Sequence, residues 1–297
     1  MLNPPLSLLS DDLLFSIVEE VAKFSFAKEN LNNLSRADRA FTQSCQKYIF
    51  RKLILGNRMK MKISEVKKFL DDKPSFANQV RIVRLEQLGI SLFKDPNFIS
   101  ILQLLAKSPM SPHELQLGTL SLMNSTIEDP MYVMRQLTGS FFSQTLTILR
   151  VTGCANVPLP IFLICPRLRE VLLDMDGATD KSYNKYPDDQ CSGREAPLLE
   201  VFNYRNSHSV VEQMIAPPPR FKTPVVLWSN LRVLTIAPHD KEGVACLQPI
   251  LDAACNSLEE LYLTTISGGD CRCGVLVSRI EFDKFLIQLN NSHLLDS

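Results

Sequence analysis

Few residues in this chain have the types and spacing that metal or redox chemistry requires. Its eight cysteines are scattered, at positions 45, 154, 165, 191, 246, 255, 271 and 273. The one close pair is Cys271-Arg-Cys273, whereas structural zinc sites usually combine two pairs of the Cys-x-x-Cys kind. Because no second pair exists, we expect reduced, unligated cysteines, many of them buried as small apolar side chains. The sequence predicts no metal site.

The four histidines offer no catalytic arrangement either. His113, His208, His239 and His293 each fall in a turn-like or terminal segment. His239 precedes Asp240, but neighbours in sequence do not make a triad, and no G-x-S-x-G accompanies them. The glycine-rich loops that cradle nucleotide phosphates are also missing, and only 11 glycines occur. We therefore predict no catalytic residue and no cofactor, and an enzyme on an α/β sheet has little support.

The composition is that of a globular protein, and its charge balance does not favour a strongly charged partner. Apolar residues make up 45% and charged residues 22% of 297 residues, and the formal net charge is zero. This balance gives no electrostatic reason to expect nucleic acid or an anionic membrane surface. The uncharged run 151–166 is short and contains three prolines, so it does not resemble a membrane span. The start lacks a secretory pattern, because Asp11 and Asp12 interrupt its apolar core. We expect a cytoplasmic or nuclear location.

The elements that could position a binding site begin with a helix in "LLSDDLLFSIVEEVAKF", residues 8–24. Ser10 is a suitable N-cap, and Asp11 and Asp12 place negative charge in the first turn, where the helix dipole favours it. Leu9 and Leu14 have the spacing of a hydrophobic staple. These signals predict a helix that starts at Asp11.

This helix is apolar around much of its circumference. Its apolar residues are Leu13, Leu14, Phe15, Ile17, Val18, Val21 and Phe24. They cover roughly 200°, against the ~100° stripe typical of a surface helix. Either the helix lies inside a larger core, or one face packs on the following helices and another receives a partner protein.

The residues up to about 55 complete a short helical unit that resembles the F-box. A second helix is expected from about Leu31 and a third around Cys45–Phe50. The positions that match the motif are Leu9, Asp11, Asp12, Leu13, Leu14, Ile17, Leu31, Leu34, Ser35, Arg39, Phe41, Phe50, Arg51 and Leu53. One departure is Ser10, which stands where the motif usually has proline; serine can cap the helix, but a contact of the proline ring would be lost.

This resemblance implies a partner. F-box units dock on the Skp-type adaptor of a cullin–RING (SCF-type) ubiquitin ligase. The adaptor-binding residues that it implies here are Leu9, Ser10, Leu13, Leu14 and Ile17.

Beyond residue 75, an apolar triad with spacing i, i+3, i+5 recurs seven times. The copies are Val80/Val83/Leu85, Leu117/Leu120/Leu122, Leu146/Leu149/Val151, Leu168/Val171/Leu173, Leu199/Phe202/Tyr204, Leu231/Leu234/Ile236 and Leu258/Leu261/Leu263. The last two positions of each copy alternate with polar residues, which predicts a short strand with one buried face. Helical segments are expected between the strands, at 63–70, 96–108, 129–137, 158–166, 209–215 and 243–255.

Strands and helices that alternate in units of this length resemble a leucine-rich-repeat solenoid. We thus predict an α/β chain with an F-box-like helical unit over 1–55 and an irregular leucine-rich-repeat solenoid over 56–297. The run 52–55 is a possible opening strand between them. Two segments, near 176–197 and 216–224, are polar or proline-rich and predict loop insertions.

Between the last two triad positions of each copy lies a residue that must point to the opposite face of its strand. These residues are Arg84, Ser121, Arg150, Leu172, Asn203, Thr235 and Tyr262, and we expect them to form one contiguous row. Target binding is predicted on this row, by Arg84, Arg150, Asn203 and Tyr262, with Arg150 and Tyr262 as anchors because such residues are enriched in binding hot spots.

Two functions follow as hypotheses. The first is a non-catalytic, substrate-recognition subunit of a cullin–RING ubiquitin ligase that binds the Skp-type adaptor, and through it cullin, and an unidentified target protein. The second is a leucine-rich-repeat interaction scaffold that acts outside a ubiquitin ligase.

Overall fold

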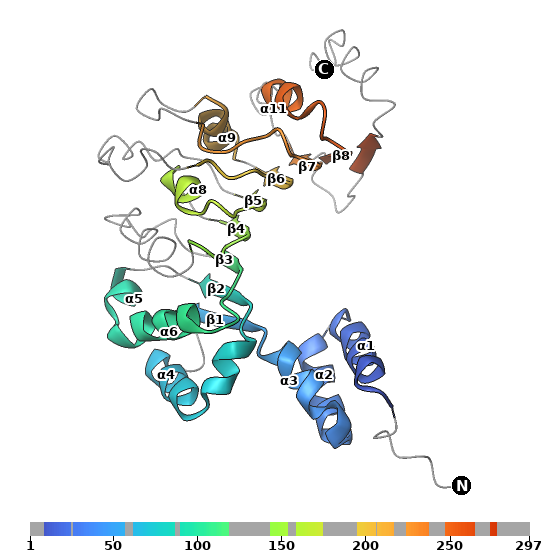
Figure 1. Ribbon diagram of the computed structural model, residues 1–297, viewed down its shortest axis with the longest axis vertical. Helices are drawn as coiled ribbons and strands as arrows, with labels where there is room; N and C mark the ends of the chain where they lie inside the picture. The colour runs from blue at the N-terminus through green and yellow to red at the C-terminus, as the bar shows by residue number, and fades with distance from the viewer. Residues whose placement is uncertain are drawn as a thin grey trace.

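A helical unit and an open sheet make up the described part of the computed structural model, which is a mixed α/β structure (Figure 1). The structure describes residues 9–24, 26–56, 62–86, 90–118, 143–153, 159–174, 195–205, 207–216, 224–237, 247–264 and 274–277. In the described residues, no helix is both long and apolar enough to cross a membrane.

The N-terminal helical unit contains α1 (Asp11–Ala22), α2 (Ala27–Ala37), the 3-10 turn η2 (Arg39–Phe41) and α3 (Thr42–Ile49). The predicted start of α1 is confirmed, since the Ser10 hydroxyl accepts a hydrogen bond from the Leu13 amide at 3.4 Å. The second helix begins at Ala27, four residues before the predicted position. The core of the unit consists of Leu14, Val18, Leu31, Phe41 and Cys45.

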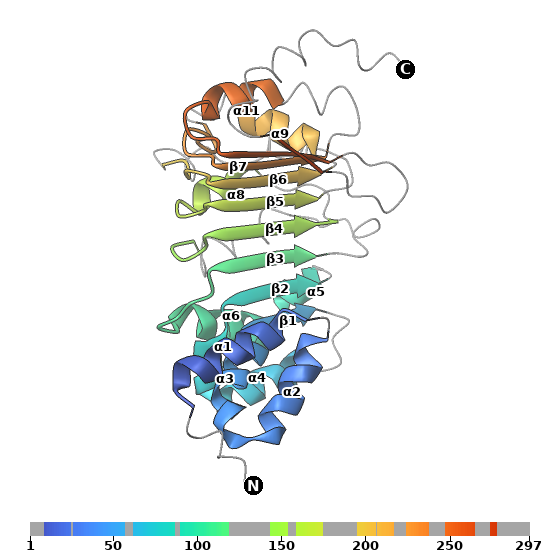
Figure 2. The same ribbon diagram turned by 90° about the vertical axis from the view of Figure 1, so that its right-hand side faces the viewer.

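In the described residues, eight parallel strands follow in strictly sequential order (Figure 2), and a short ninth strand pairs antiparallel with the eighth. They are β1 (Lys52–Gly56), β2 (Ile82–Glu86), β3 (Glu114–Gly118), β4 (Ile148–Thr152), β5 (Glu170–Asp174), β6 (Val201–Arg205), β7 (Val233–Ala237), β8 (Glu260–Thr264) and β9 (Gly274–Val277). Each strand therefore pairs with the strands that precede and follow it in the chain. The predicted opening strand at 52–55 is confirmed as β1.

Helices lie in the connections between the strands. They are α4 (Ile63–Asp72), η3 (Pro74–Gln79), α5 (Ile90–Lys94), α6 (Pro96–Lys107), α8 (Pro160–Ile164), α9 (His208–Ile215) and α11 (Leu247–Ala254). Five of the six predicted helical segments are confirmed by α4, α6, α8, α9 and α11. The sixth, 129–137, lies outside the described residues, as does most of the predicted loops at 176–197 and 216–224. In Figure 1, α5, α6, α8 and α9 lie on the same side of the strands.

One face of the sheet is buried against these helices. Two side chains of most strands point into the core, and they include Val83, Leu85, Leu115, Leu117, Leu149, Val151, Val171, Leu173, Phe202, Tyr204, Leu234 and Ile236. The residues between them are mostly half-buried or exposed, as the alternation of side chains along a strand requires. A single continuous core runs from Leu55 to Leu261 along the sheet.

The predicted register of the second triad is wrong. Strand β3 spans Glu114–Gly118 and buries Leu115 and Leu117, so the strand lies earlier than the triad placed it. The predicted strand positions Leu120 and Leu122 lie outside the described residues. Leucines alternate both before and after Gly118, and the spacing alone does not distinguish the two phases.

A cluster of three phenylalanines packs the connection between α3 and β1 against α4 and η3. Phe50, between α3 and β1, lies 4.1 Å from Phe76 and 6.0 Å from Phe69, measured between ring centroids. Phe69 and Phe76 belong to α4 and η3 and stack on each other at 5.2 Å. Pairs of aromatic rings at such distances contribute about 0.5–1.5 kcal/mol beyond the area that they bury. This cluster fixes the chain as it leaves α3 and enters β1.

Gly56 provides a test of the sheet's first strand pair. A Cβ at this position would lie 2.1 Å from the Glu86 carbonyl oxygen on β2, which is backbone and cannot move aside cheaply. We predict that Gly56→Ala lowers the free energy of unfolding by about 1–3 kcal/mol, as overpacking usually does. The control is Gly118→Ala, because its Cβ would meet the Arg84 side chain at an ordinary 3.5 Å. Equal urea midpoints for both variants and the parent would contradict the prediction.

Candidate binding surfaces

Helix α1 presents three different faces. Leu14 and Val18 are buried in the helical unit. Leu13 and Ile17, one turn apart, are 54% and 39% exposed, and Phe24, just past the helix end, is 66% exposed. The wide apolar arc of the sequence is therefore only partly explained by the core, and its remainder is an apolar surface.

The third face of α1 carries Phe15, which is partly exposed. Its ring lies 5.7 Å from that of Tyr48 on α3. The position of Phe15, about 200° around the helix from Leu13, explains why it faces neither the core nor the apolar surface.

Most of the predicted adaptor-binding residues lie at the N-terminal half of α1 or just before it. Leu9 is half-buried, Ser10 is exposed, and Leu13 and Ile17 lie on the apolar surface. Leu14 is a correction: only 5% of it is exposed, because it packs in the core of the helical unit. Leu14 packs beneath the apolar surface of α1 and is not part of that surface.

The predicted row is confirmed, with one replacement, on the face of the sheet opposite the helices, which we call the uncovered face because no described helix of the strand connections packs on it. The strand register aligns Arg84, Gln116, Arg150, Leu172, Asn203, Thr235 and Tyr262 across neighbouring strands (Figure 2). Gln116 takes the place predicted for Ser121, which lies outside the described residues, because the strand β3 precedes it. We call this line of residues the central row.

The predicted anchors of the central row already have partners within the chain. Arg150 joins three strands, since its Nε lies 2.9 Å from Glu114 on β3 and its Nη2 lies 2.6 Å from Glu170 on β5. Arg84 pairs with Glu86 at 2.9 Å. The Tyr262 hydroxyl donates a hydrogen bond to Glu260, which raises the pKa of Tyr262. A target must compete with these carboxylates to bind Arg84 or Arg150.

An apolar patch in the middle of the uncovered face was missed by the sequence analysis. Ile148, Val201 and Val233 precede the central row on β4, β6 and β7, and Leu172 lies in the row on β5. All four are half-buried. The sequence does show an apolar residue at the first position of β4, β6 and β7, but this position is not part of the triad. Glu170 separates Ile148 from Val201 along this line, so the uncharged part of this face consists of Leu172, Val201 and Val233 with Asn203 and Thr235 beside them.

The described residues contain no cluster of His, Cys, Asp and Glu that could hold a metal ion. Cys45 and Cys165 are buried, and burial raises the pKa of the Cys45 thiol, which disfavours the reactive thiolate. Cys255 is an exposed free thiol. The Cys271/Cys273 pair, His239 and His293 lie outside the described residues.

Arg150 provides a test of the uncovered face. The Glu114 side chain is only 10% exposed, and Arg150→Gln would remove its charged partner, although Gln116 would still donate to it at 2.6 Å. We predict a loss of about 1–3 kcal/mol in the free energy of unfolding. Arg232→Gln is the matched control, because Arg232 pairs with an exposed carboxylate, Glu259, and exposed ion pairs contribute little to stability. Similar losses in both variants, measured by urea unfolding, would refute the structural role.

Comparison with known proteins does not place the chain in a family. No family model matches the sequence, and no curated protein is similar enough to it to count as a relative. Its function must therefore be inferred from the two surfaces described above, the apolar surface of α1 and the uncovered face of the sheet.

Proposed function

We propose that this chain is a non-catalytic, substrate-recognition subunit of a cullin–RING ubiquitin ligase. The helical unit binds a Skp-type adaptor, and the uncovered face of the sheet binds a target protein. The chain makes and breaks no bonds in this function. It raises the effective concentration of the target near the ubiquitin-conjugating enzyme, so that an intermolecular step becomes nearly intramolecular. Such a protein acts in the cytoplasm or nucleus.

The observation that carries the proposal is the exposed apolar surface of α1. Leu13 and Ile17 expose large apolar side chains one turn apart on a helix whose other face packs in the core, and Phe24, just past the helix end, is exposed as well. Exposed apolar clusters of this kind mark protein interaction sites more often than chance. The F-box-like pattern of residues 9–53 adds the chemical identity of the partner, and the adaptor contact comprises Leu9, Ser10, Leu13 and Ile17.

We further propose that residues 56–297 form a leucine-rich-repeat solenoid. Its support is the sequential order of parallel strands in equivalent register and the helices in the connections between them. In such an array each unit completes its core only against its neighbours. The separate cores of the helical unit and of the sheet support a division near residue 55.

The adaptor contact can be tested with the double variant Leu13→Asp/Ile17→Asp. Each of these side chains contributes ~1.5–3 kcal/mol when buried at an interface, so their loss should weaken capture of a purified Skp-type adaptor at least a hundredfold. The matched control is Leu198→Asp/Leu227→Asp, which changes two exposed leucines of the sheet region. Capture is measured by pull-down and folding by circular dichroism on the same preparation.

Three outcomes are separable in this experiment. Loss of capture with an unchanged circular dichroism spectrum in the first variant alone supports the ligase function. Undiminished capture, or no capture by the parent chain, contradicts it and favours the second function, an interaction scaffold outside a ubiquitin ligase. Global unfolding of the first variant would contradict the assignment of Leu13 and Ile17 to a free face.

The target-binding face can be tested with Leu172→Glu/Thr235→Glu. These changes place two negative charges on the central row beside the apolar patch, and we expect the proteins that co-purify with the chain, other than the adaptor, to decrease at least tenfold. The control Gln103→Glu/Gln213→Glu adds the same charge on α6 and α9, on the helical side. Quantitative mass spectrometry measures both sets, with adaptor recovery as the internal standard. Equal recovery of all partners from the two variants would remove the central row as the target site.

A further inference from the structure

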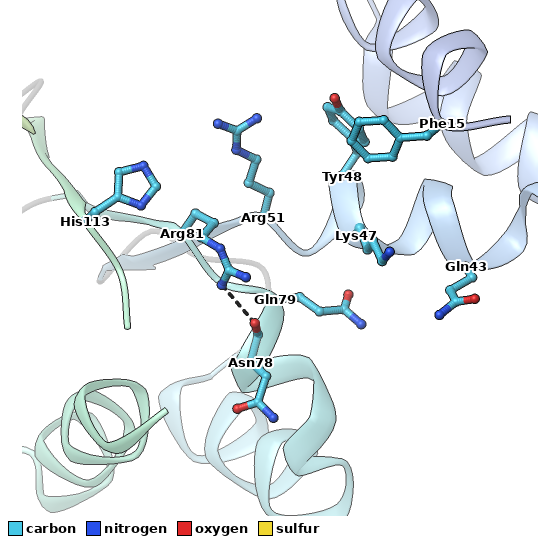
Figure 3. Close-up of a pocket in the computed structure, with 9 residues that line it drawn as sticks. All are labelled: Phe15, Gln43, Lys47, Tyr48, Arg51, Asn78, Gln79, Arg81 and His113. Atoms are coloured by element: carbon cyan, nitrogen blue, oxygen red, sulfur yellow. Dashed lines mark hydrogen bonds between the residues drawn. The ribbon is translucent and has the colours of Figure 1, made fainter. Parts of the chain in front are cut away.

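A cavity of about 400 Å³ lies at the junction of the helical unit and the sheet (Figure 3). Its lining residues come from α1, α3, η3 and the chain just before β1, β2 and β3. They are Phe15, Gln43, Lys47, Tyr48, Arg51, Asn78, Gln79, Arg81 and His113. The volume is within the range of about 300–1,000 Å³ that is typical of small-molecule sites.

The cavity combines three cationic side chains with no lining carboxylate. Lys47, Arg51 and Arg81 carry the positive charge, and His113 adds an imidazole. Within the described residues, none of the three cations makes an ion pair with an Asp or Glu. Because the whole chain has a formal net charge of zero, this charge is a local concentration and not part of a generally basic protein.

The residues that immediately precede the strands show how unusual this concentration of positive charge is within the sheet. Arg51, Arg81 and His113 occupy equivalent positions, each immediately before a strand, and backbone hydrogen bonds link them in order: the Arg81 amide donates to the Arg51 carbonyl at 2.8 Å and the His113 amide to the Arg81 carbonyl at 3.1 Å. The same line continues along the sheet through Arg169, Glu200, Arg232 and Glu259.

Further along this line, each arginine is neutralised by the glutamate that follows it. Arg169 pairs with Glu200 at 2.9 Å, and Arg232 pairs with Glu259 at 2.7 Å. Only at the cavity do successive positions carry basic residues alone. An acidic partner is thus supplied by the chain at the other end of the line, whereas among the described residues the line has none at the cavity, where the nearby Glu19 carboxylate interacts with the Tyr48 hydroxyl.

Arg81 is held in place without being neutralised. Its Nη1 donates to the carbonyl oxygens of Asn78, Val80 and Met110 at 2.8, 3.1 and 3.0 Å. These bonds fix the guanidinium but leave its Nε and Nη2 without a hydrogen-bond partner among the described residues. Burial, and then the nearby Arg51 guanidinium, lower the pKa of Arg81, as expected for a cation that lacks a counter-charge.

Two further features of the cavity suit an organic ligand. Phe15 and Tyr48 form an aromatic wall beside the cationic groups (Figure 3). The Gln79 side-chain oxygen is buried without a hydrogen-bond partner among the described residues, and such an atom costs roughly 1–3 kcal/mol. A ligand that offers hydrogen-bonding groups allows the Gln79 amide to turn and relieve this cost.

We propose that the junction cavity binds a small phosphorylated molecule, with its phosphate groups on Lys47, Arg51 and Arg81 and its organic part against Phe15 and Tyr48. The cationic groups come from α3 and from the residues before β1 and β2, and all three line the cavity. A tetrahedral phosphate offers oxygens to all of them, whereas a planar carboxylate offers two in one plane. Pyrophosphate carries several negative charges, so it can neutralise three cationic side chains better than an anion with one charge can.

The test is isothermal titration of the full chain with inorganic pyrophosphate, at constant ionic strength in chloride. We expect one site per chain, and at least tenfold weaker binding by Lys47→Gln/Arg51→Gln. Both side chains are exposed, so the variant should remain folded. The matched control is Lys28→Gln/Arg36→Gln, which removes one lysine and one arginine from exposed positions of α2. Its affinity should stay within twofold of the parent.

Two further titrations decide the ligand class. Citrate, a carboxylate of comparable charge, should bind at least tenfold more weakly than pyrophosphate, and ADP should bind at least as tightly, with a loss of affinity in Phe15→Ala. The absence of pyrophosphate binding, an equal loss in the control variant, or equal affinity for citrate would overturn the proposal. No adaptor is present in these titrations, so their outcome is independent of the ligase function.

Discussion

Burial of two apolar side chains from each strand against the covering helices is the interaction on which this structure depends. Each such pair removes enough apolar surface from water to contribute about 3–6 kcal/mol before the entropy of folding is subtracted. The pairs are continuous from Leu55 to Leu261, so every strand shares its core with its neighbours. This burial sets the parallel register of the strands. The register in turn aligns the residues between the buried positions, which form the central row, and the residues just before the strands, which form the line from Arg51 to Glu259.

The helical unit shows how a sequence can be more apolar than its own core requires. Its core is filled by a few side chains from each helix, and α1 still exposes Leu13 and Ile17 on one side and Phe15 on another. The Phe50 cluster holds the unit beside the start of the sheet, which is why a cavity forms between them. Two surfaces with different chemistry, one apolar and one cationic, thus lie on or beside the helical unit.

Much of the fold could be predicted from the sequence, because the alternation of buried and half-buried side chains leaves a direct record in the spacing of apolar residues. The cap at Ser10 and most strands and helices follow from local chemistry. The register of β3 could not be predicted, since leucines alternate on both sides of Gly118. The width of the apolar arc of α1 left open whether the helix lies inside a larger core or has a free face, and it did not show that Leu14 is buried. The cationic cavity was missed because Lys47, Arg81 and His113 are far apart in sequence and meet only through the register.

The sequential order of the strands also bears on how the chain reaches this structure. Each strand pairs with one that was synthesised before it, as β2 pairs with β1 through Lys52 and Ile82. Strand pairing therefore joins neighbouring units of the chain and never units at opposite ends of the sheet. A chain emerging from the ribosome can add each new strand to an existing edge, starting from the helical unit and β1, as domains generally fold from the N-terminus during synthesis. The exposed edge moves along the chain during translation, until the antiparallel β9 pairs with β8.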